Sequence, residues 1–208
     1  MTASSAPRRL VVISAGLRQP SSTRLLADRL RDAVGTAAAA RDLALEASTV
    51  ELREHARDLT GMLLTGAPTP ALDAFLSQVA GADAVVLVTP IYSGAYTGMV
   101  KDLVDLLPAE ALAGVPVLIG GTGGTARHAL ALDHTLRPLL GHVRAVVAPS
   151  AVFAATEDFG GAGEGAQSLA RRVDRAAREL VELVAGRPPR AVHDPFDVSG
   201  FTDLLGDA

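Results

Sequence analysis

Short apolar runs alternate with segments of helical periodicity along most of the chain. Three runs, 10–13, 84–88 and 115–119, are continuous rather than alternating, which is typical of strands buried on both faces of a sheet. A less apolar segment, 43–52, is interpreted as a less buried strand, and 143–147 as the last core strand. The pattern therefore predicts five strands.

Apolar residues recur at helical spacing between these strands. In the first helix the repeating positions are Leu25, Leu26, Leu30 and Val34, after a start at 21–23. Further helices are predicted over 71–80, 98–107, 126–140 and 167–184, with Pro138 in the last turn of the fourth. Residues 53–66 are interpreted as a structured excursion without a regular element.

Strands that alternate with helices predict a doubly wound α/β fold, with a five-stranded parallel sheet and helices on both faces. Ligands of such sheets bind outside the carboxyl ends of the strands, where the winding reverses. Function should therefore lie in three loops, 14–23, 89–97 and 120–125. We expect one domain over 1–186 and an irregular extension over 187–208, which is rich in proline and glycine.

Composition narrows the possible functions. The chain has 208 residues, a formal net charge of −4, two tyrosines, no tryptophan and no cysteine. The lack of cysteine excludes thiol catalysis, and the scarcity of rings and basic clusters argues against nucleic-acid binding. No apolar run approaches membrane-spanning length, and the amino terminus lacks the pattern of a signal peptide. We expect a soluble, cytoplasmic protein without a membrane or nucleic-acid partner.

The first loop has the chemistry of a phosphate site. Four hydroxyl residues and one arginine surround a helix amino terminus, where unpaired N–H groups favour an anion. They are Ser14, Arg18, Ser21, Ser22 and Thr23. A lysine-containing phosphate loop and a glycine-rich dinucleotide fingerprint are both absent, so a single terminal phosphate, as in FMN, fits best. The alternative is that Ser21 or Ser22 only caps the helix.

The other two loops could hold a planar ring. A Pro-x-Tyr-Ser-Gly turn at 90–94 could supply a wall and main-chain amides, although a turn with two half-exposed tyrosines is an equal alternative. Glycines at 120–124 permit close approach of a flat ligand, a weak signal alone. Lys101 and Asp105, four residues apart, are interpreted as a surface or inter-subunit ion pair.

The five histidines are interpreted as structural. His128 and His134 are six residues apart, whereas metal ligands on a helix prefer a spacing of four, so no metal site is predicted. No G-x-S-x-G elbow supports a hydrolase triad. His128 alone lies near the predicted ligand edge.

At the three loops the chain resembles the NAD(P)H-dependent FMN reductases, a flavodoxin-like family. The resemblance spans 10–159 and rests on 14–24, on 89–94 continuing to Gly98, Lys101 and Asp105, and on 120–134. The run 120–139, with Arg137 and the stretch 152–156, is most similar to the branch whose reduced flavin feeds luciferase-like two-component monooxygenases. The resemblance implies the flavodoxin-like strand order 2-1-3-4-5.

The resemblance also implies a role for each matched residue. Ser14, Arg18, Ser21, Ser22 and Thr23 would hold the FMN phosphate. Pro90, Ile91, Tyr92 and Ser93 would line the flavin ring, and Thr122, Gly123 and Gly124 would close its other edge. FMN would itself take the hydride from NADPH or NADH, so no catalytic side chain is expected. A homodimer or homotetramer, and a partner monooxygenase, are implied as well.

Several alternatives stay open at this level. The protein could keep FMN bound and reduce quinones, azo dyes or metal oxyanions, or it could be a flavodoxin-like electron carrier without nicotinamide oxidation. A regulatory domain without flavin would leave the hydroxyl loop without a ligand. Arg18, Arg24 or Arg127 could each receive the 2′-phosphate of NADPH, and no spacing selects one.

Overall fold

The computed structural model describes residues 6–160 and 164–190. Its strands are β1 (Arg8–Ser14), β2 (Leu45–Glu51), β3 (Ala84–Pro90), β4 (Pro116–Gly123), β5 (Val146–Val147) and β6 (Val152–Ala155). Its α-helices are α1 (Ser22–Ala39), α2 (Ala56–Thr65), α3 (Pro70–Ala80), α4 (Gly98–Leu106), α5 (Arg137–His142) and α6 (Glu164–Ala185). Strands and helices alternate, as the pattern predicted.

The strands form one parallel sheet in the order β2-β1-β3-β4-β5, with β6 also paired to β4. This confirms the doubly wound, flavodoxin-like α/β class and its strand order. The winding reverses between β1 and β3, so the loops that follow these two strands lie next to each other.

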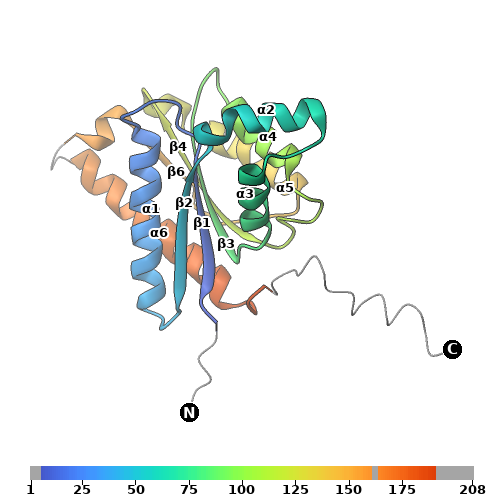
Figure 1. The fold of residues 1–208 in the computed structure, drawn as a ribbon. Coiled ribbons are helices and arrows are strands. Elements are labelled where there is room, and N and C mark those ends of the chain that lie inside the picture. Colours follow the sequence, from blue (N-terminus) through green and yellow to red (C-terminus); the bar gives the residue numbers. More distant parts are fainter. Residues whose placement is uncertain (1–5, 161–163, 191–208) are drawn as a thin grey trace, which may run out of the picture.

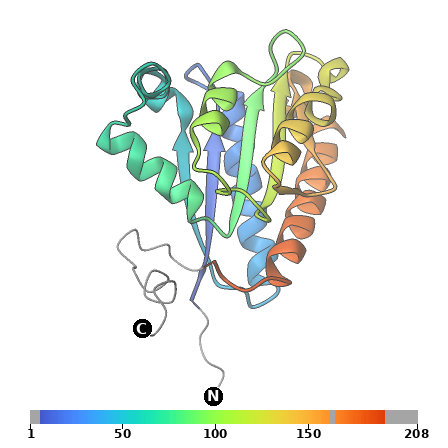
Figure 2. The ribbon, with the colours of Figure 1, turned by 90° about the vertical axis from the view of Figure 1, so that its right-hand side faces the viewer.

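Helices cover both faces of the sheet (Figures 1 and 2). Along β1, Leu10 and Val12 pack in the cluster that includes α1 and α6, whereas Val11 and Ile13 pack in the cluster that includes α3 and α4. All four side chains are at most 2% exposed. Because successive side chains of a strand point to opposite faces, a strand between two helical layers must be apolar throughout. This explains the continuous apolar runs in the sequence.

The predicted last strand, 143–147, is wrong in extent. Two short strands, β5 and β6, lie beside β4 instead, and 148–151 separates them. Pro149 lacks the N–H that a continuous ladder would need. The Arg137 guanidinium donates to the carbonyl oxygens of Ala148 and Pro149, and the main-chain N–H of Ser150 donates to the Glu179 carboxylate. These side-chain hydrogen bonds satisfy main-chain groups of the interruption that no neighbouring strand pairs.

The predicted long helix over 126–140 is also wrong. The segment consists of a 3-10 turn at Ala126–His128, a π-helical turn at Leu132–Leu136 and the short helix α5. Pro138 lies in the first turn of α5 rather than in a last turn, a position where its missing N–H has no helical partner to lose.

Residues 53–66 do form regular structure, contrary to the sequence interpretation. A 3-10 turn, Leu52–His55, leads into α2, which ends at Gly66 in a left-handed conformation (φ 75°). Only Leu59 of α2 is fully buried, and Leu63 and Leu64 are exposed. A helix with so narrow a buried stripe gives little amphipathic signal.

The final helix, α6, ends at Ala185. Of the predicted extension over 187–208, only 187–190 belongs to the described residues, so most of it lies outside them. None of the described helices combines the length and the apolar character that crossing a membrane would require.

Candidate active site

The three predicted loops meet at the carboxyl edge of the sheet. Ser14 ends β1, Pro90 ends β3, and Thr122 lies one residue from the end of β4. Strands β1 and β3 are neighbours, and Pro90 is in register with Thr122. The main-chain N–H of Ile91 donates to the carbonyl oxygen of Thr122 at 2.8 Å, which joins the second and third loops directly.

The first loop presents free main-chain amides at the start of α1. Ser21 is the N-cap, and its hydroxyl accepts from the N–H of Arg24 at 3.2 Å. Within the described ranges, the N–H groups of Ser22 and Thr23 have no acceptor. Ser21 thus does cap the helix, but two amides and the exposed Ser22 side chain stay available to an anion.

Gly16 allows this loop to fold against the helix. A Cβ at Gly16 would lie 2.2 Å from the Ser21 hydroxyl oxygen and 3.2 Å from the Thr23 Cβ. Real side chains do not approach so closely, so a larger residue would displace the N-cap. The sequence interpretation named the hydroxyl residues of this loop and missed the glycine that packs against them. Its position directly after a strand and before a helix was the available signal.

Ser14 is fully buried, and its hydroxyl has no hydrogen-bond partner among the described residues. A buried hydroxyl without a partner is unfavourable, typically by about 1–3 kcal/mol. Arg18 is exposed and forms no ion pair with a described carboxylate. The loop therefore contains two groups that a bound phosphate would satisfy.

Thr23 and Thr122 are in direct contact. Their hydroxyl oxygens are 2.9 Å apart, and both residues are at least 95% buried. The sequence assigned them to different parts of a ligand, the phosphate and the ring. In the structure they hydrogen-bond to each other and so fix the distance between the first and third loops.

The second loop is a tight hairpin. Tyr92 and Ala95 exchange two main-chain hydrogen bonds of 3.0 and 3.1 Å, and the residues between them, Ser93 and Gly94, have φ values of 50° and 80°. Positive φ at both central positions defines a type I′ turn. The N–H groups of Ser93 and Gly94 have no acceptor in the part of the chain that the structure describes.

Burial divides the residues predicted to line a ring. Pro90 and Ile91 are buried, and Ile91 belongs to the core under α3 and α4, while Tyr92 is 50% exposed. Thr97 joins the end of this loop to β3, because its N–H donates to the Thr89 hydroxyl at 3.2 Å. The Thr97 hydroxyl is itself buried and has no partner among the described residues. Sequence reasoning did not single out Thr97.

Glycines in the third loop lie under bulky side chains. A Cβ at Gly121 or at Gly123 would come within 2.8 Å of Leu132 or Phe153, respectively. These two glycines are therefore required for packing within the protein. Gly124 has open space around its Cβ position and is exposed, so a ligand can approach it.

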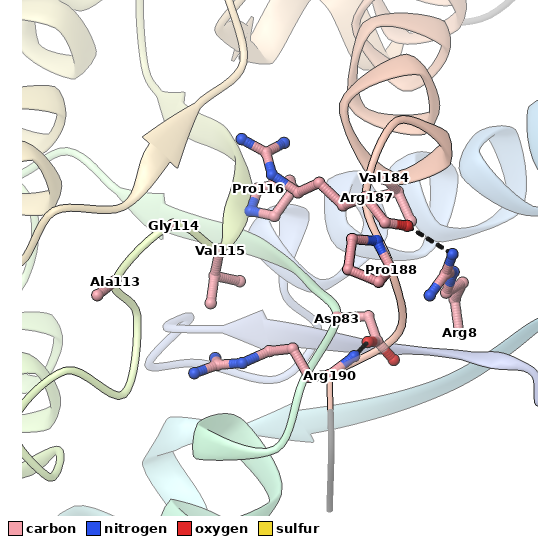
Figure 3. Close-up of a pocket in the computed structure, with 10 residues that line it drawn as sticks. All are labelled: Arg8, Asp83, Ala113, Gly114, Val115, Pro116, Val184, Arg187, Pro188 and Arg190. Carbon is pink, nitrogen blue, oxygen red and sulfur yellow. Dashed lines mark hydrogen bonds between the residues drawn. The ribbon is translucent and has the colours of Figure 1, made fainter.

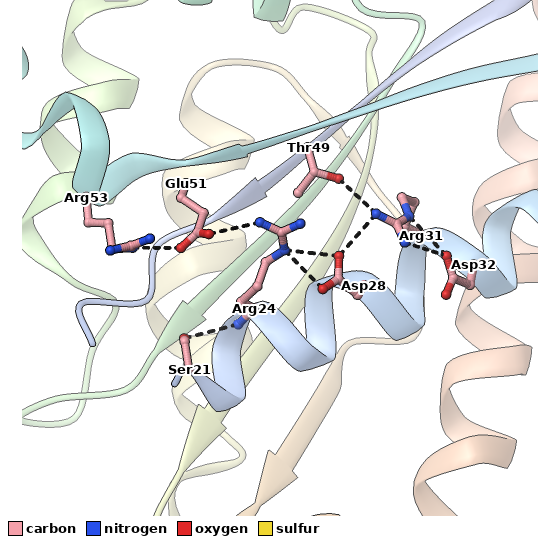
Figure 4. A network of polar contacts seen from close by, with 8 residues as sticks. All are labelled: Ser21, Arg24, Asp28, Arg31, Asp32, Thr49, Glu51 and Arg53. Atoms are coloured by element: carbon pink, nitrogen blue, oxygen red, sulfur yellow. Dashed lines mark hydrogen bonds and ion pairs between the residues drawn. The ribbon is translucent and has the colours of Figure 1, made fainter. Parts of the chain in front are cut away.

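A charged network links α1 to the end of β2 beside the first loop (Figure 4). Arg24 donates to Asp28 at 3.0 Å and to Glu51 at 2.9 Å, and Arg53 donates to Glu51 at 2.7 Å. The hydrogen bond from Arg53, with the charges of Arg53 and Arg24, lowers the pKa of the Glu51 carboxyl below its ordinary value, although burial opposes this shift. Arg24 is thus committed to two carboxylates.

Other candidate groups have structural roles. The Lys101 ammonium lies 2.6 Å from Asp105 on the exposed face of α4, as predicted, and this hydrogen bond raises the pKa of Lys101. His55 stacks on Phe75 with ring centroids 5.0 Å apart. Residues 6–160 and 164–190 contain no cluster of histidine and acidic side chains that could hold a metal ion. His193 lies outside these ranges.

A parallel sheet with the order 2-1-3-4-5 and helices on both faces defines a flavodoxin-like fold. Solved structures agree. An oxidoreductase from Corynebacterium diphtheriae is 48% identical, with a TM-score of 0.83 over 88% of this chain and all of that one. The apo form of the NADH:FMN oxidoreductase EMOB is 27% identical, with a TM-score of 0.66 over 82% and 88% of the two chains. An archaeal flavodoxin at 10% identity and TM-score 0.57 shares the fold.

Residues 8–160 match the NADPH-dependent FMN reductase family, and the chain belongs to that family. An FMN reductase (NADPH) of Pseudomonas aeruginosa is 35% identical over 87% of this chain and 95% of its own length. The NADH-dependent FMN reductase SfnE of Pseudomonas putida is 37% identical over 86% and 94%. The protein is accordingly an oxidoreductase that uses NAD(P)H and FMN, as the resemblance implied.

Proposed function

We propose that the carboxyl edge of β1, β3 and β4 binds FMN through the residues selected from the sequence. The phosphate lies against Ser14, Arg18, Ser21, Ser22 and Thr23. Two observations carry this assignment: among the described residues, the amides of Ser22 and Thr23 have no acceptor, and the buried hydroxyl of Ser14 has no partner. These groups fit a terminal phosphate, which accepts several hydrogen bonds at a helix amino terminus.

The flavin ring lies between the second and third loops. Tyr92 and Ser93 line it with Pro90 and Ile91, and Thr122, Gly123 and Gly124 close the other edge. The Ile91 side chain is buried and its N–H is bonded to Thr122, whereas the amides of Ser93 and Gly94, which have no acceptor among the described residues, can donate to the polar edge of the ring. Such donors stabilise the charge that a reduced flavin carries.

FMN supplies the redox chemistry when bound, because its ring accepts a hydride from NAD(P)H. The protein positions the two rings and provides donors at the polar edge. Hydride transfer to the flavin needs no acid or base on the nicotinamide, so we assign no catalytic side chain. Catalysis then depends on proximity and orientation rather than on a catalytic side chain.

The ion-pair partners of the three candidate arginines support one choice for the 2′-phosphate of NADPH. Arg24 is neutralised by Asp28 and Glu51. Arg18 is assigned to the flavin phosphate. Arg127 is exposed in the turn after β4 and has no ion-pair partner among the described residues, so we assign the 2′-phosphate to Arg127.

We further propose that the flavin is exchangeable, that reduced FMN passes to a partner monooxygenase, and that the enzyme works in the cytoplasm as a homodimer or homotetramer. The exposed apolar side chains of Leu63 and Leu64 on α2, and of Leu130 near the third loop, support an oligomer. A reductase of quinones or azo dyes with tightly held FMN is the alternative enzyme.

An anaerobic titration tests the proposal. Protein at micromolar concentration is mixed with FMN and then with NADPH or NADH, and the visible flavin spectrum is followed. We expect a shifted spectrum on binding and bleaching on addition of the nicotinamide. Multiple turnovers with excess free FMN would support exchange, whereas turnover with a quinone but not with free FMN would favour the alternative. Absence of both binding and bleaching would refute the site.

A further inference from the structure

A small hollow lies at the amino ends of the strands, at the opposite edge of the sheet from the flavin loops (Figure 3). Its volume is about 90 Å³. This space is large enough for several waters or for one organic molecule of a few heavy atoms, and it is well below the roughly 300 Å³ at which pockets for larger ligands begin. Its lining comprises Arg8, Asp83, Ala113, Gly114, Val115, Pro116, Val184, Arg187, Pro188 and Arg190.

The Arg8 guanidinium in this hollow is incompletely paired. Arg8 is the first residue of β1 and is only 8% exposed. Its Nη2 donates to the carbonyl oxygen of Arg187 at 2.7 Å. Its Nε and Nη1 are buried and have no acceptor among residues 6–160 and 164–190. A buried cation with unsatisfied donors is costly, and a bound anion would relieve that cost.

Capping of α6 explains only part of this arrangement. The helix ends at Ala185, and a cation near a helix carboxyl terminus interacts favourably with the helix dipole. The hydrogen bond from Arg8 Nη2 to the Arg187 carbonyl oxygen holds the guanidinium near this helix end. It leaves the other two nitrogens of the guanidinium without a partner among the described residues.

The lining carries an excess of positive charge. Three arginines and a single carboxylate, Asp83, belong to the lining, and the guanidinium that pairs with Asp83 is that of Arg9, which is not among the lining residues. Both Asp83 oxygens accept from main-chain amides, Oδ1 from Arg190 and Oδ2 from Arg9, at 2.6 and 2.7 Å. The guanidinium of Arg190 donates to the carbonyl oxygen of Ala111, and that of Arg187 to Leu183. Asp83 makes no hydrogen bond or ion pair with the guanidinium of Arg8, Arg187 or Arg190.

The remaining wall is apolar. It consists of Val115, Pro116, Val184 and Pro188. Two of these side chains, Val115 and Val184, are almost fully buried. A fully hydrated inorganic ion gains little from such a wall. A short aliphatic chain gains by leaving water, while its carboxylate pairs with a guanidinium in planar geometry.

We propose that this hollow binds a small aliphatic carboxylate, with its charged end at Arg8 and its hydrocarbon end against Val115 and Val184. The site is separate from the flavin loops, so it goes beyond the proposed function and can be tested without flavin turnover.

Thermal unfolding of the full-length protein tests the site. Sodium butyrate is added against sodium chloride of equal ionic strength, with uncharged butyramide as the isosteric control. At about ten times the dissociation constant, butyrate should raise Tm by about 3 °C or more, and butyramide should not. Arg8→Gln removes the charge of the guanidinium, so it should abolish the butyrate shift.

Two controls make the result specific. Arg175→Gln removes an exposed arginine from α6, far from the hollow, and should leave the butyrate shift intact. Loss of the shift in that variant, with retention in Arg8→Gln, would place the anion on the helix surface and overturn the site. An equal shift with sulfate and with butyrate would overturn the carboxylate assignment. No shift with butyrate would overturn the proposal altogether.

Discussion

The hydroxyl groups of Thr23 and Thr122, 99 residues apart in sequence, share a buried hydrogen bond of 2.9 Å. Thr23 lies in the first turn of α1, and Thr122 lies near the end of β4. The bond therefore joins the loop proposed to hold the FMN phosphate to the loop proposed to close the ring. Because both ends are buried, neither hydroxyl can exchange this partner for bulk water.

A double-mutant cycle of Thr23→Val and Thr122→Val should reveal this coupling. Each single substitution leaves one buried hydroxyl unpaired and should lower the free energy of unfolding by about 1–2 kcal/mol. The double variant should lose less than the sum, because two apolar groups of similar shape then pack together. Urea unfolding of the apo protein measures all three. Strict additivity would contradict the coupling.

The phosphate assignment predicts a specific effect of Ser22→Asp. A carboxylate beside the bound phosphate should weaken FMN binding by at least about tenfold, as measured by flavin fluorescence titration. The apo protein should be as stable as the wild type, since an acid in the first turn of a helix is favourable. Ser77→Asp on α3 adds the same charge at an exposed position away from the loops and should bind FMN normally. An unchanged FMN affinity in Ser22→Asp would show that this loop does not bind the phosphate.

Glu51 should make stability depend on pH. Its pKa is lowered in the folded protein, so its contribution is complete above the ordinary value of 4.5 and is lost as the pH falls through the folded pKa. Glu51→Gln should cost about 1–2 kcal/mol at pH 7 and less at pH 3, because part of the carboxylate's contribution is lost below the ordinary pKa. Glu46→Gln, on the exposed part of the same strand, is the matched control. A cost that does not change between these pH values would show that the network does not stabilise the carboxylate.

Nicotinamide specificity should depend on Arg127. Arg127→Gln should raise the KM for NADPH by about tenfold and leave the KM for NADH nearly unchanged, because only NADPH carries the 2′-phosphate. Steady-state kinetics with both nucleotides measure the difference, with Arg171→Gln on α6 as a surface control. Equal changes for the two nucleotides would exclude Arg127 as the determinant.

Much of the fold could be predicted because burial on both faces leaves a direct trace in sequence. The runs that became β1, β3 and β4 are apolar at every position, and each is followed by a loop with distinctive residues. The segment 126–140 carried no such trace. Its π-helical turn packs Leu132 over Gly121, a contact between distant residues that helical periodicity along one segment does not encode.

The sequence alone determined the fold class, the three loops and the chemical character of each, because strand burial and the residues after each strand are local properties of the chain. Only the tertiary structure decided which groups are free to act. Ser21, Ser22 and Thr23 look alike in sequence, yet one caps a helix, one is exposed, and one is paired with Thr122. Arg24 and Arg127 are likewise both arginines near a loop, but only Arg24 meets two carboxylates. Availability depends on partners that lie far away along the chain, and folding alone brings them together.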